Sequence, residues 1–377
     1  MTGIEGTPTI EPIVPPRLPA DIDTPAVVID LDIVERNARR LGDALAARGI
    51  ALRPHAKTHK SVALARLQLE AGASGLTVGN LGEAEVFAAA GLDDVFIAYP
   101  VWAEGPKAAR LGVLHEIMGL RLVVGFDSIE GAERLAAAVA GSRRRLAVML
   151  ELDPGNRRTG APADRAGEIA AAARDLGLEV RGVFTHGGHA YAPGAAAPAG
   201  AEEVATLAVG AAALAAEGIE PVVISAGSTP TQLTAAVAPV NEIRAGTYLI
   251  GDRQQWAIGA VPGDGVAIAV AATVVSAAVA GQVVIDAGAK TLTKDVASYL
   301  TGHGLLPAYP DASLERVSDY HGVVRIPPGT PSPRVGEVVV VIPNHVCPVI
   351  DLRDSFLATR DGSIVGVWPV DARGRSG

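Results

Sequence analysis

The sequence predicts an α/β protein, namely a parallel (β/α)8 barrel followed by a mainly antiparallel β domain. From Ala26 to Gly251, short apolar runs alternate about eight times with longer amphipathic runs, which is typical of a barrel in which a helix follows each strand. Near Gly251 the helical periodicity stops, while valine-rich runs separated by Gly, Pro and Asp continue to Val370. A doubly wound open sheet is the alternative, disfavoured because no glycine-rich dinucleotide motif follows the first strand.

Each expected element is defined by the period of its apolar residues. Amphipathic runs predict helices at 33–48, 83–90, 128–140, 164–176 and 201–217. The barrel domain is therefore expected at residues 24–252. Shorter apolar runs have the length and composition of buried strands, and the strand candidates of the barrel are 26–31, 50–53, 75–78, 95–99, 121–126, 146–152, 180–185 and 222–225.

The β domain is assigned residues 1–23 and 253–377, and the N-terminal segment is expected to dock on it. Asp361-Gly362 between two apolar runs predicts a tight hairpin. Residues 371–377 are expected to form a frayed tail. Residues 265–285 carry no charge and are long enough to span a bilayer, but their valines and the Gly281-Gln282 break favour two buried strands. The strand candidates of this domain are 266–279, 283–286, 323–326, 338–342 and 364–368.

Composition limits the classes of function. The chain has 377 residues, of which 49% are hydrophobic, so it can bury a sizeable core. Its formal charge of −9 disfavours a nucleic-acid partner, and no basic run suggests an anionic membrane surface. The single cysteine, Cys347, excludes an intramolecular disulfide and fits a reducing compartment. No basic start followed by an apolar core is visible before Asp23, so no signal peptide is predicted and the expected location is the cytoplasm.

The densest polar cluster lies between the strand expected at 50–53 and a helical run that begins at Ser61. It reads Arg53-Pro54-His55-Ala56-Lys57-Thr58-His59-Lys60. In a barrel of alternating strands and helices, this edge is where chemistry is done. The residues alone give about equal weight to a charged loop or anion-binding patch and to a site built on a lysine nucleophile. Burial and cationic neighbours would lower the pKa of such a lysine and free its amine to form a Schiff base.

Three further polar clusters follow expected strands. Residues 153–160 hold two arginines, and residues 184–191 hold two histidines and a tyrosine around a glycine pair. Residues 225–231 are rich in small hydroxyl side chains, and Pro230 is expected to open a helix whose first N–H groups would hold a phosphate. Taken alone, the first and third clusters are more often ordinary turns, whereas the second suggests a pocket.

A candidate metal site lies in the expected β domain. His345 and Cys347 are separated by one residue after a run of four valines, and in an extended strand this spacing puts both side chains on one face. Two ligands are too few for a closed structural zinc site but suffice for an open site that keeps positions for water and substrate. A buried cysteine beside a turn histidine is the plainer interpretation of these two residues alone.

The cluster at residues 53–60 resembles the pyridoxal-phosphate lysine motif of the D-threonine aldolase and D-serine dehydratase family, whose barrel is similar to the N-terminal domain of alanine racemases. Residues 23–30 resemble the opening strand of that family, and further matches extend to about Asp351. The resemblance implies that Lys57 forms the Schiff base with pyridoxal 5'-phosphate. It assigns catalytic roles to Lys57, His59 and His189. It assigns cofactor contacts to Lys57, His55, Arg158, His186, Tyr191, Ser228, Thr229, Gly246 and Thr247.

The same resemblance gives some of these residues particular roles. It implies that Arg158 reaches the phenolic oxygen of the cofactor and that His186 stacks on the pyridine ring. The phosphate is then held by Ser228, Thr229, Gly246 and Thr247. No residue is assigned to the pyridine nitrogen.

Two departures within the family bear on the reaction. D-serine dehydratases tend to have a tyrosine where this chain has Phe184. His345 and Cys347 are the implied ligands of a divalent metal, Zn²⁺ or Mn²⁺ with Mg²⁺ as a third option, and D-threonine aldolases more often have an aspartate at the second position. The histidine–cysteine pair therefore favours dehydration, and Phe184 weakens that preference.

The predicted function is a lyase that uses pyridoxal phosphate and a divalent metal to act on a D-configured 3-hydroxy amino acid. Dehydration is slightly preferred to retro-aldol cleavage. One alternative is a metal-independent amino-acid racemase, for which Tyr299 and Tyr320 are unassigned acid–base candidates. The other is a pyridoxal-phosphate-binding protein without catalysis, which the extra β domain disfavours. The family also implies a homodimer.

Overall fold

The computed structural model describes residues 11–117 and 119–377, and they fall into two compact units. The first unit comprises the described residues up to Arg36 together with Tyr248–Val349 and Phe356–Val367. The second unit comprises Asn37–Thr247, Ile350–Ser355 and Trp368–Gly377. We call the second the barrel unit and the first the β unit.

The barrel unit is built on an eight-stranded parallel sheet with the order β2-β9-β8-β7-β6-β5-β4-β3. An isolated parallel bridge between His55 and Thr77 joins the two edge strands, and the Thr77 amide donates to the Pro54 carbonyl at 2.8 Å. The predicted parallel barrel is therefore confirmed. Its strands are β2 (Ala51–Leu52), β3 (Leu76–Val78), β4 (Asp94–Pro100), β5 (Arg121–Phe126), β6 (Ala147–Glu151), β7 (Glu179–Phe184), β8 (Val223–Ala226) and β9 (Glu242–Ile243).

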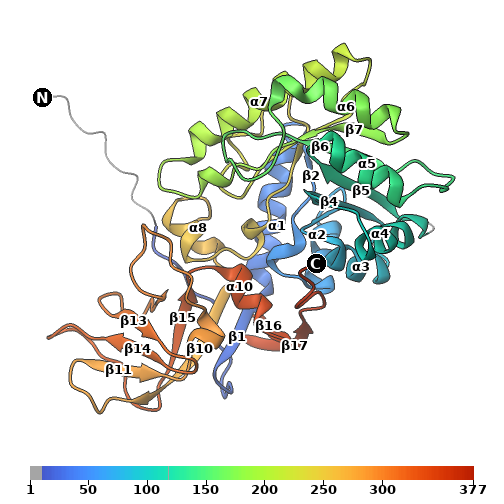
Figure 1. Cartoon of the computed structure of the whole chain (residues 1–377). Helices are drawn as coiled ribbons and strands as arrows, with labels where there is room; N and C mark the ends of the chain where they lie inside the picture. The colour runs from blue at the N-terminus through green and yellow to red at the C-terminus, as the bar shows by residue number, and fades with distance from the viewer. Residues whose placement is uncertain (1–10, 118) are drawn as a thin grey trace, which may run out of the picture. The chain divides into compact units, whose positions relative to one another are not determined.

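Helices follow the barrel strands, and Figure 1 shows them around the outside of the sheet. Polar side chains begin several of them: Asn80 accepts from the Glu83 amide at 3.0 Å, and Ser128 accepts from the Gly131 amide at 3.2 Å. The barrel helices are α2 (Val62–Glu70), α3 (Leu81–Ala89), α4 (Pro106–Glu116), α5 (Ile129–Ala138), α6 (Ala166–Asp175) and α7 (Ala196–Ala216), and α1 (Leu31–Ala46) precedes them.

Helix α7 is long and apolar enough, by length and composition alone, to cross a membrane. It packs against α6, β7 and β8, as the apolar helix of a barrel does.

The C-terminal segment corrects one expectation. Residues 371–377 are not frayed, because the Ala372 amide donates to the Lys60 carbonyl at 3.0 Å. The Asp371 carboxylate accepts from the Val62 amide at 2.7 Å. Ser61, at the N-cap of α2, makes no side-chain capping bond, so a residue distant in sequence supplies the cap.

The first predicted strand of the barrel is wrong, and one barrel strand was not predicted. β1 (Ala26–Asp30) pairs antiparallel with β10 (Ile268–Ser276) and parallel with β16 (Ser355–Arg360), so it belongs to the other sheet. The eighth barrel strand is instead β9, which the sequence analysis did not predict. The apolar run of β1 indicates a buried strand without saying which sheet buries it, and the two residues of β9 are too few to show a period.

The β unit contains a nine-stranded, mostly antiparallel sheet, as predicted. The uncharged stretch at 265–285 forms β10 and β11, which confirms two strands rather than a membrane helix. The hairpin between β16 and β17 is confirmed too: Asp361 and Gly362 have φ angles of 44° and 76°. The further strands are β11 (Gln282–Ile285), β12 (Gly304–Leu305), β13 (Ser313–Val317), β14 (Gly322–Arg325), β15 (Val338–Pro343) and β17 (Ser363–Pro369), and the short helices are α8 (Arg253–Ala257), α9 (Ala289–Leu292) and α10 (Val346–Asp351).

The N-terminal segment was expected to dock on the β domain. Its first ten residues lie outside the described part of the chain. Of the following residues, Val14 donates its amide to the Gly263 carbonyl at 3.1 Å, and Arg17 forms an exposed ion pair with Asp361 at 2.8 Å. All four residues belong to the β unit.

A layer of large side chains crosses the middle of the barrel. Phe96, Met149 and Phe184 are buried together, and the rings of Phe96 and Phe184 meet edge to face at 5.1 Å. The Arg244 guanidinium lies over both rings, 5.8 Å and 5.1 Å from their centroids. Arg244 also donates to the Ser225 hydroxyl at 2.5 Å and to the Thr185 carbonyl. This layer, which we call the aromatic layer, separates the two ends of the barrel interior.

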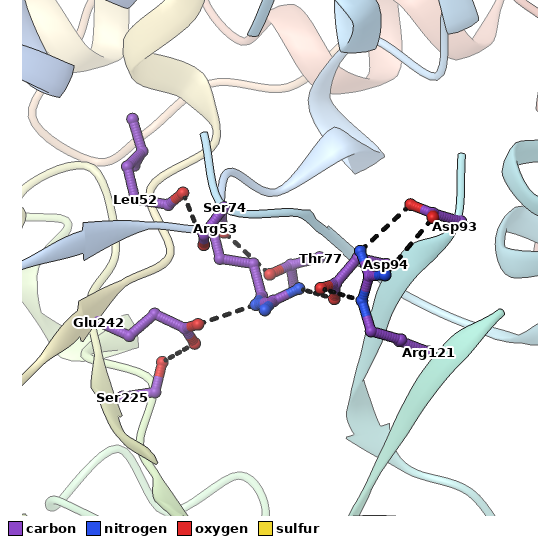
Figure 2. A network of polar contacts seen from close by, with 9 residues as sticks. All are labelled: Leu52, Arg53, Ser74, Thr77, Asp93, Asp94, Arg121, Ser225 and Glu242. Atoms are coloured by element: carbon purple, nitrogen blue, oxygen red, sulfur yellow. Dashed lines mark hydrogen bonds and ion pairs between the residues drawn. The ribbon is translucent and has the colours of Figure 1, made fainter. Parts of the chain in front are cut away.

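A network of buried charges lies on the N-terminal side of this layer (Figure 2). Arg53 donates to Asp94 at 2.5 Å and to Glu242 at 2.8 Å. Glu242 accepts from the Ser225 hydroxyl at 2.7 Å, and Asp94 also receives Arg121 at 3.0 Å. Because each carboxylate here has a guanidinium partner, the charges can be buried at an acceptable cost.

Candidate active site

A cavity of about 320 Å³ opens at the C-terminal end of the barrel. The residues that line it follow the C-terminal ends of β2, β3, β4, β6, β7, β8 and β9, the edge at which barrel enzymes place their chemistry. The lining residues are His55, Lys57, Thr58, Gly79, Ala98, Tyr99, Arg158, Thr159, Phe184, His186, Tyr191, Gly227, Ser228, Arg244, Gly246 and Thr247.

The cavity brings together most of the site residues predicted from the sequence. They come from five separate loops and are up to 192 positions apart, from His55 to Thr247. The predicted residues that line it are His55, Lys57, Arg158, His186, Tyr191, Ser228, Gly246 and Thr247.

Lys57 lies in a single 3₁₀ turn, Ala56–Thr58, directly after β2. His55 is the N-cap of this turn, and its Nδ1 accepts from the Lys57 amide at 3.4 Å. The Lys57 side chain is exposed and lines the cavity, so burial, one of the two causes considered for a lowered pKa, does not apply to it. The turn holds the backbone of Lys57 in place while its amine can reach a ligand in the cavity.

The cavity is electropositive. Lys57, Arg158 and Arg244 line it, whereas no Asp or Glu does among the residues that the structure describes. Burial lowers the pKa of His55 well below its usual value, and the nearby Lys57 and Arg244 lower it further. Burial likewise lowers the pKa of His186, with Lys57, Arg158 and Arg244 adding to the effect. Both imidazoles are therefore neutral at pH 7. The positive charge that an anionic ligand would meet in the cavity comes from Lys57, Arg158 and Arg244.

The wall of the cavity near Arg158 contains a buried carboxylate that does not reach the cavity surface. The Glu151 carboxylate accepts from the Thr159 hydroxyl at 2.9 Å and lies 3.7 Å from Arg158. Burial raises the pKa of Glu151, while Thr159 and Arg158 oppose that shift. Arg158 is therefore only weakly neutralised from behind and can present its charge to a ligand.

A glycine allows a close approach between two loops of the cavity. A Cβ on Gly246 would lie 2.8 Å from the Thr58 hydroxyl oxygen and 2.9 Å from the His55 carbonyl oxygen. Any side chain at this position would push the loop after β9 away from the loop that carries Lys57. The residue type predicted for the phosphate site is thus required by the packing of the loop itself.

The loop after β8 differs from the expectation. No helix begins at Pro230, because in the described chain β8 is followed by turns as far as β9. The Ser228 amide donates to the Thr231 hydroxyl at 3.1 Å, which closes a local turn. Thr229 is buried and does not line the cavity, while Ser228 does. The expected helix N-terminus is therefore replaced by a turn with its own side-chain hydrogen bonds.

The two histidines predicted to be catalytic do not line the cavity. His59 is fully buried, with Nε2 3.0 Å from Gln68 and Nδ1 accepting from the Ser61 amide at 3.1 Å. Burial lowers its pKa to about 4. His189 places Nε2 2.8 Å from Glu202. Both rings are held by protein groups outside the lining, so we carry neither into the proposed site.

Several lining residues were not among the predicted site residues. Tyr99 is the penultimate residue of β4 and is 47% exposed, and Thr58 and Thr159 add hydroxyl groups. Phe184 and Arg244 form part of the wall. The signal that could have identified Tyr99 is its position at the C-terminal end of a barrel strand. Arg244 was not among the predicted site residues, and its contacts with the aromatic layer could not be inferred from the sequence.

The predicted metal ligands lie in the β unit, in a local structure that differs from the prediction. β15 ends at Pro343 and Cys347 is the second residue of α10, so the two side chains do not alternate along a strand. They meet across a strand-to-helix junction, where the His345 ring is hydrogen-bonded to Cys347. His345 Nδ1 also lies 2.5 Å from the Asp295 carboxylate.

The surroundings of His345 favour a positive charge. Burial by itself lowers the pKa of His345, but Cys347, Asp252 and Asp295 together raise it to about 10. No cluster of three or more His, Cys, Asp or Glu side chains suited to a metal is present in the described ranges. The pair fits an open site of two protein ligands, in which a divalent cation would replace the proton on the imidazole and water would complete the coordination.

The fold and cavity together define a (β/α)8 barrel protein with an electropositive cavity and an amine at its C-terminal end. Residues 29–254 match the family described as "Alanine racemase, N-terminal domain". Residues 267–359 match the "Putative serine dehydratase domain". The chain belongs to the alanine racemase N-terminal domain family.

Curated relatives cover nearly the whole chain. D-threo-3-hydroxyaspartate dehydratase from Delftia sp. (strain HT23) is 35% identical over 92% of this chain and 97% of the relative. D-threonine aldolase from Arthrobacter sp. is 32% identical over 96% of this chain and 97% of the relative.

Solved structures give the same picture. The crystal structure of D-threonine aldolase from Filomicrobium marinum has a TM-score of 0.87 and 31% identity, covering 97% of this chain and 100% of that one. A cysteine-to-alanine variant of a D-threo-3-hydroxyaspartate dehydratase, described as metal-free, has a TM-score of 0.84 and 32% identity, covering 93% of this chain and 97% of that one.

Proposed function

We propose that the chain is a lyase that uses pyridoxal 5'-phosphate and a divalent metal to act on a D-configured 3-hydroxy amino acid, with dehydration as the preferred reaction. The observation that carries the proposal is the lining of the C-terminal cavity. An amine and two guanidinium groups face a space that no carboxylate of the described residues lines, and the histidines beside them are neutral. Relatives named D-threo-3-hydroxyaspartate dehydratase and D-threonine aldolase match 92% and 96% of the chain.

The residues present fit pyridoxal phosphate. Lys57 would hold the cofactor, Arg158 would bind its phenolic oxygen, and Ser228 with the glycine loop at Gly246 and Thr247 would bind its phosphate. His186 and Tyr191 would lie against the ring, because their own rings are 6.4 Å apart on the cavity wall. When bound, the cofactor withdraws electrons from the substrate bonds at Cα.

The chain's own groups then determine where protons move. The Lys57 amine is the group that would take the Cα proton in dehydration, since the pKa values of His55 and His186 are too low for either to be a strong base. Arg244 keeps its charge beneath the cavity, held by Ser225 and Thr185.

The metal proposal rests on the chemistry of the donors. Cys347 supplies a thiolate and His345 an imidazole, which together suit Zn²⁺ or Mn²⁺. A bound divalent cation supplies a Lewis acid for a substrate hydroxyl. Asp295 would hold the other imidazole nitrogen and fix the orientation of the ring.

The reaction itself is decided by product analysis. D-serine, D-threonine and D-threo-3-hydroxyaspartate are supplied to the purified protein with pyridoxal phosphate and each metal in turn. A 2-oxo acid with ammonia supports dehydration. Glycine with an aldehyde means that the chain is an aldolase. Loss of chirality without cleavage, unaffected by a chelator, would overturn the lyase proposal in favour of racemisation.

Cys347→Ala tests the metal. The variant should keep pyridoxal phosphate, lose most of its lyase activity, about 10²-fold or more, and bind Zn²⁺ at least about tenfold more weakly in a calorimetric titration. His345→Ala should behave in the same way. His321→Ala, an exposed histidine of the same unit, is the matched control and should leave both readings unchanged. Full activity of Cys347→Ala after chelation would exclude the metal role.

We also propose that the enzyme is a cytoplasmic homodimer. The support is the family and the single cysteine, which fits a reducing compartment. Sedimentation at the assay concentration measures the assembly, and a fully active monomer would contradict the dimer.

A further inference from the structure

A second cavity, of about 390 Å³, lies at the opposite, N-terminal end of the barrel. Its lining residues lie at or near the N-terminal ends of β4 to β9 and directly after β2. The size falls in the range of small-molecule sites. In a tightly filled barrel this end is occupied by layers of side chains, whereas here small residues such as Ala147 and Val223 leave it open.

The polar part of this cavity carries an excess of positive charge. Five arginines and three carboxylates line it, so the lining is positive although the chain as a whole has a charge of −9. Arg53 is neutralised by Asp94 and Glu242, as Figure 2 shows. The arginines are Arg53, Arg121, Arg144, Arg145 and Arg181, and the carboxylates are Asp94, Glu179 and Glu242.

The excess resides in two neighbouring arginines. Arg121 forms ion pairs with Asp93 and Asp94, and Arg181 forms an ion pair with Glu179 at 2.9 Å. Within residues 11–117 and 119–377, neither Arg144 nor Arg145 forms an ion pair. The Arg144 guanidinium donates to the Leu120 carbonyl at 3.4 Å, which leaves its charge without a carboxylate partner among the described residues.

The apolar part of the cavity begins directly below these arginines. Arg145, Ala147 and Met149 are spaced by two, so they share the inward face of the chain as it enters β6, and all three line the cavity. Leu122 and Phe96 continue this apolar surface and are buried. A ligand would meet charge at the mouth and hydrocarbon inside.

We propose that the N-terminal end of the barrel is a binding site for a small amphipathic anion, a carboxylate or phosphate monoester with a short apolar body. The anionic head binds Arg144 and Arg145, and the apolar body packs on Ala147, Met149 and Phe96. The aromatic layer separates this site from the C-terminal cavity, so a ligand can bind it while the other cavity is filled.

The experiment is a calorimetric titration of the full chain loaded with pyridoxal phosphate, which keeps the C-terminal cavity occupied. The probes are octanoate, hexyl phosphate, octanol and inorganic phosphate. We expect one site per chain and at least about tenfold tighter binding of an amphipathic anion than of octanol or inorganic phosphate. Whether octanoate or hexyl phosphate binds more tightly identifies the head group. Equal binding of all four probes, or none, overturns the proposal.

Variants locate the site. Arg144→Gln with Arg145→Gln should weaken binding of the preferred anion at least about tenfold, because both charge-assisted hydrogen bonds are lost. Arg143→Gln is the matched control: Arg143 belongs to the same triplet but lines a separate surface hollow, and its substitution should change the affinity less than about twofold.

Ala147→Phe tests the apolar half by filling it, and it should abolish binding. If this variant does not fold, Ala147→Leu gives the same test with less added volume and should weaken binding. Unchanged affinity in both the arginine double variant and the Ala147 variant would place the ligand elsewhere and overturn the proposal.

Discussion

The two ends of the barrel both hold arginines around a cavity, but they use them differently. At the N-terminal end, Arg53 is fixed between Asp94 and Glu242, and most of the charge is compensated within the protein. At the C-terminal end, Lys57, Arg158 and Arg244 face a cavity whose described lining contains no carboxylate. The paired charges of Arg53, Asp94 and Glu242 therefore hold strands together, whereas the positive charges at the C-terminal end face the space for a ligand.

This difference indicates where stability and chemistry are located in the fold. Arg53, Asp94 and Glu242 come from β-strands that are far apart in sequence, so their ion pairs tie β2, β4 and β9 together. The loops at the other end are held by turns and glycine contacts and leave their polar groups exposed to the cavity. Substitutions of the paired charges at the N-terminal end should therefore lower the free energy of unfolding and leave activity nearly unchanged. Substitutions in the C-terminal cavity should lower activity and leave the free energy of unfolding nearly unchanged.

The largest effect is expected at Lys57. Lys57→Ala removes the amine that holds the cofactor, so visible absorbance of bound pyridoxal phosphate should disappear and lyase activity should fall about 10³-fold or more. The unfolding midpoint should change little, because the side chain is exposed. Borohydride reduction of the wild-type protein followed by peptide mapping should place the label on Lys57. A label on Lys60 or Lys290 would refute the assignment.

The second largest effect is expected at Arg53, where a substitution should lower stability and leave activity nearly unchanged. Arg53→Met should lower the free energy of unfolding by about 3 kcal/mol, because it leaves Asp94 and Glu242 buried with one partner fewer. The activity of the folded fraction should remain within about threefold of wild type. Arg165→Met, which removes an exposed pair with Glu168, is the control and should cost about 0.5 kcal/mol or less. Urea unfolding and an activity assay on the same samples measure both quantities.

The smallest effect distinguishes structural from catalytic histidines at the C-terminal end. His59 has a pKa of about 4 in the folded chain because it is buried, against about 6.5 when unfolded. The unfolded chain thus binds more protons between these values, so the stabilising contribution of neutral His59 is complete above pH 6.5 and is lost as the pH falls towards 4. Between about pH 7 and about pH 5 the loss is about 2 kcal/mol.

His59→Gln should make the free energy of unfolding less sensitive to acid over this range, measured from urea curves at several pH values. His115→Gln, a second buried histidine of the barrel unit, is the comparison variant. A steeper acid dependence in His59→Gln than in wild type would contradict the assignment. If His59→Gln lost far more activity than its fraction of unfolded protein accounts for, His59 would have a catalytic role.

The barrel could be predicted because its signal is periodic and repeated. Alternating strand and helix runs located seven of the eight barrel strands, and Asp361-Gly362 located a hairpin. The error at β1 has a physical cause: a buried strand reads the same in either sheet. β9 escaped because two residues cannot display a period.

The candidate site was predictable to the extent that its residues cluster in sequence. The stretch around Lys57 and the pair His345 and Cys347 are short motifs, so they could be recognised. Contacts between distant residues could not: Arg53 and Glu242 are 189 positions apart, and nothing local indicates that they meet. The turn that replaces the helix expected at Pro230 depends on a hydrogen bond between Ser228 and Thr231, which a proline signal does not reveal.

The polar network described for the barrel interior limits how this sequence can diverge. From Asp94 through Arg53, Glu242 and Ser225 to Arg244, each group is satisfied by the next. A single replacement in this network leaves a buried group without its partner, so we expect tolerated changes to occur as coupled substitutions. The apolar walls of the N-terminal cavity have no such dependence, since a single substitution such as one at Ala147 can fill the space. During evolution, the size of that cavity should therefore change more readily than the network of charges that lines part of it.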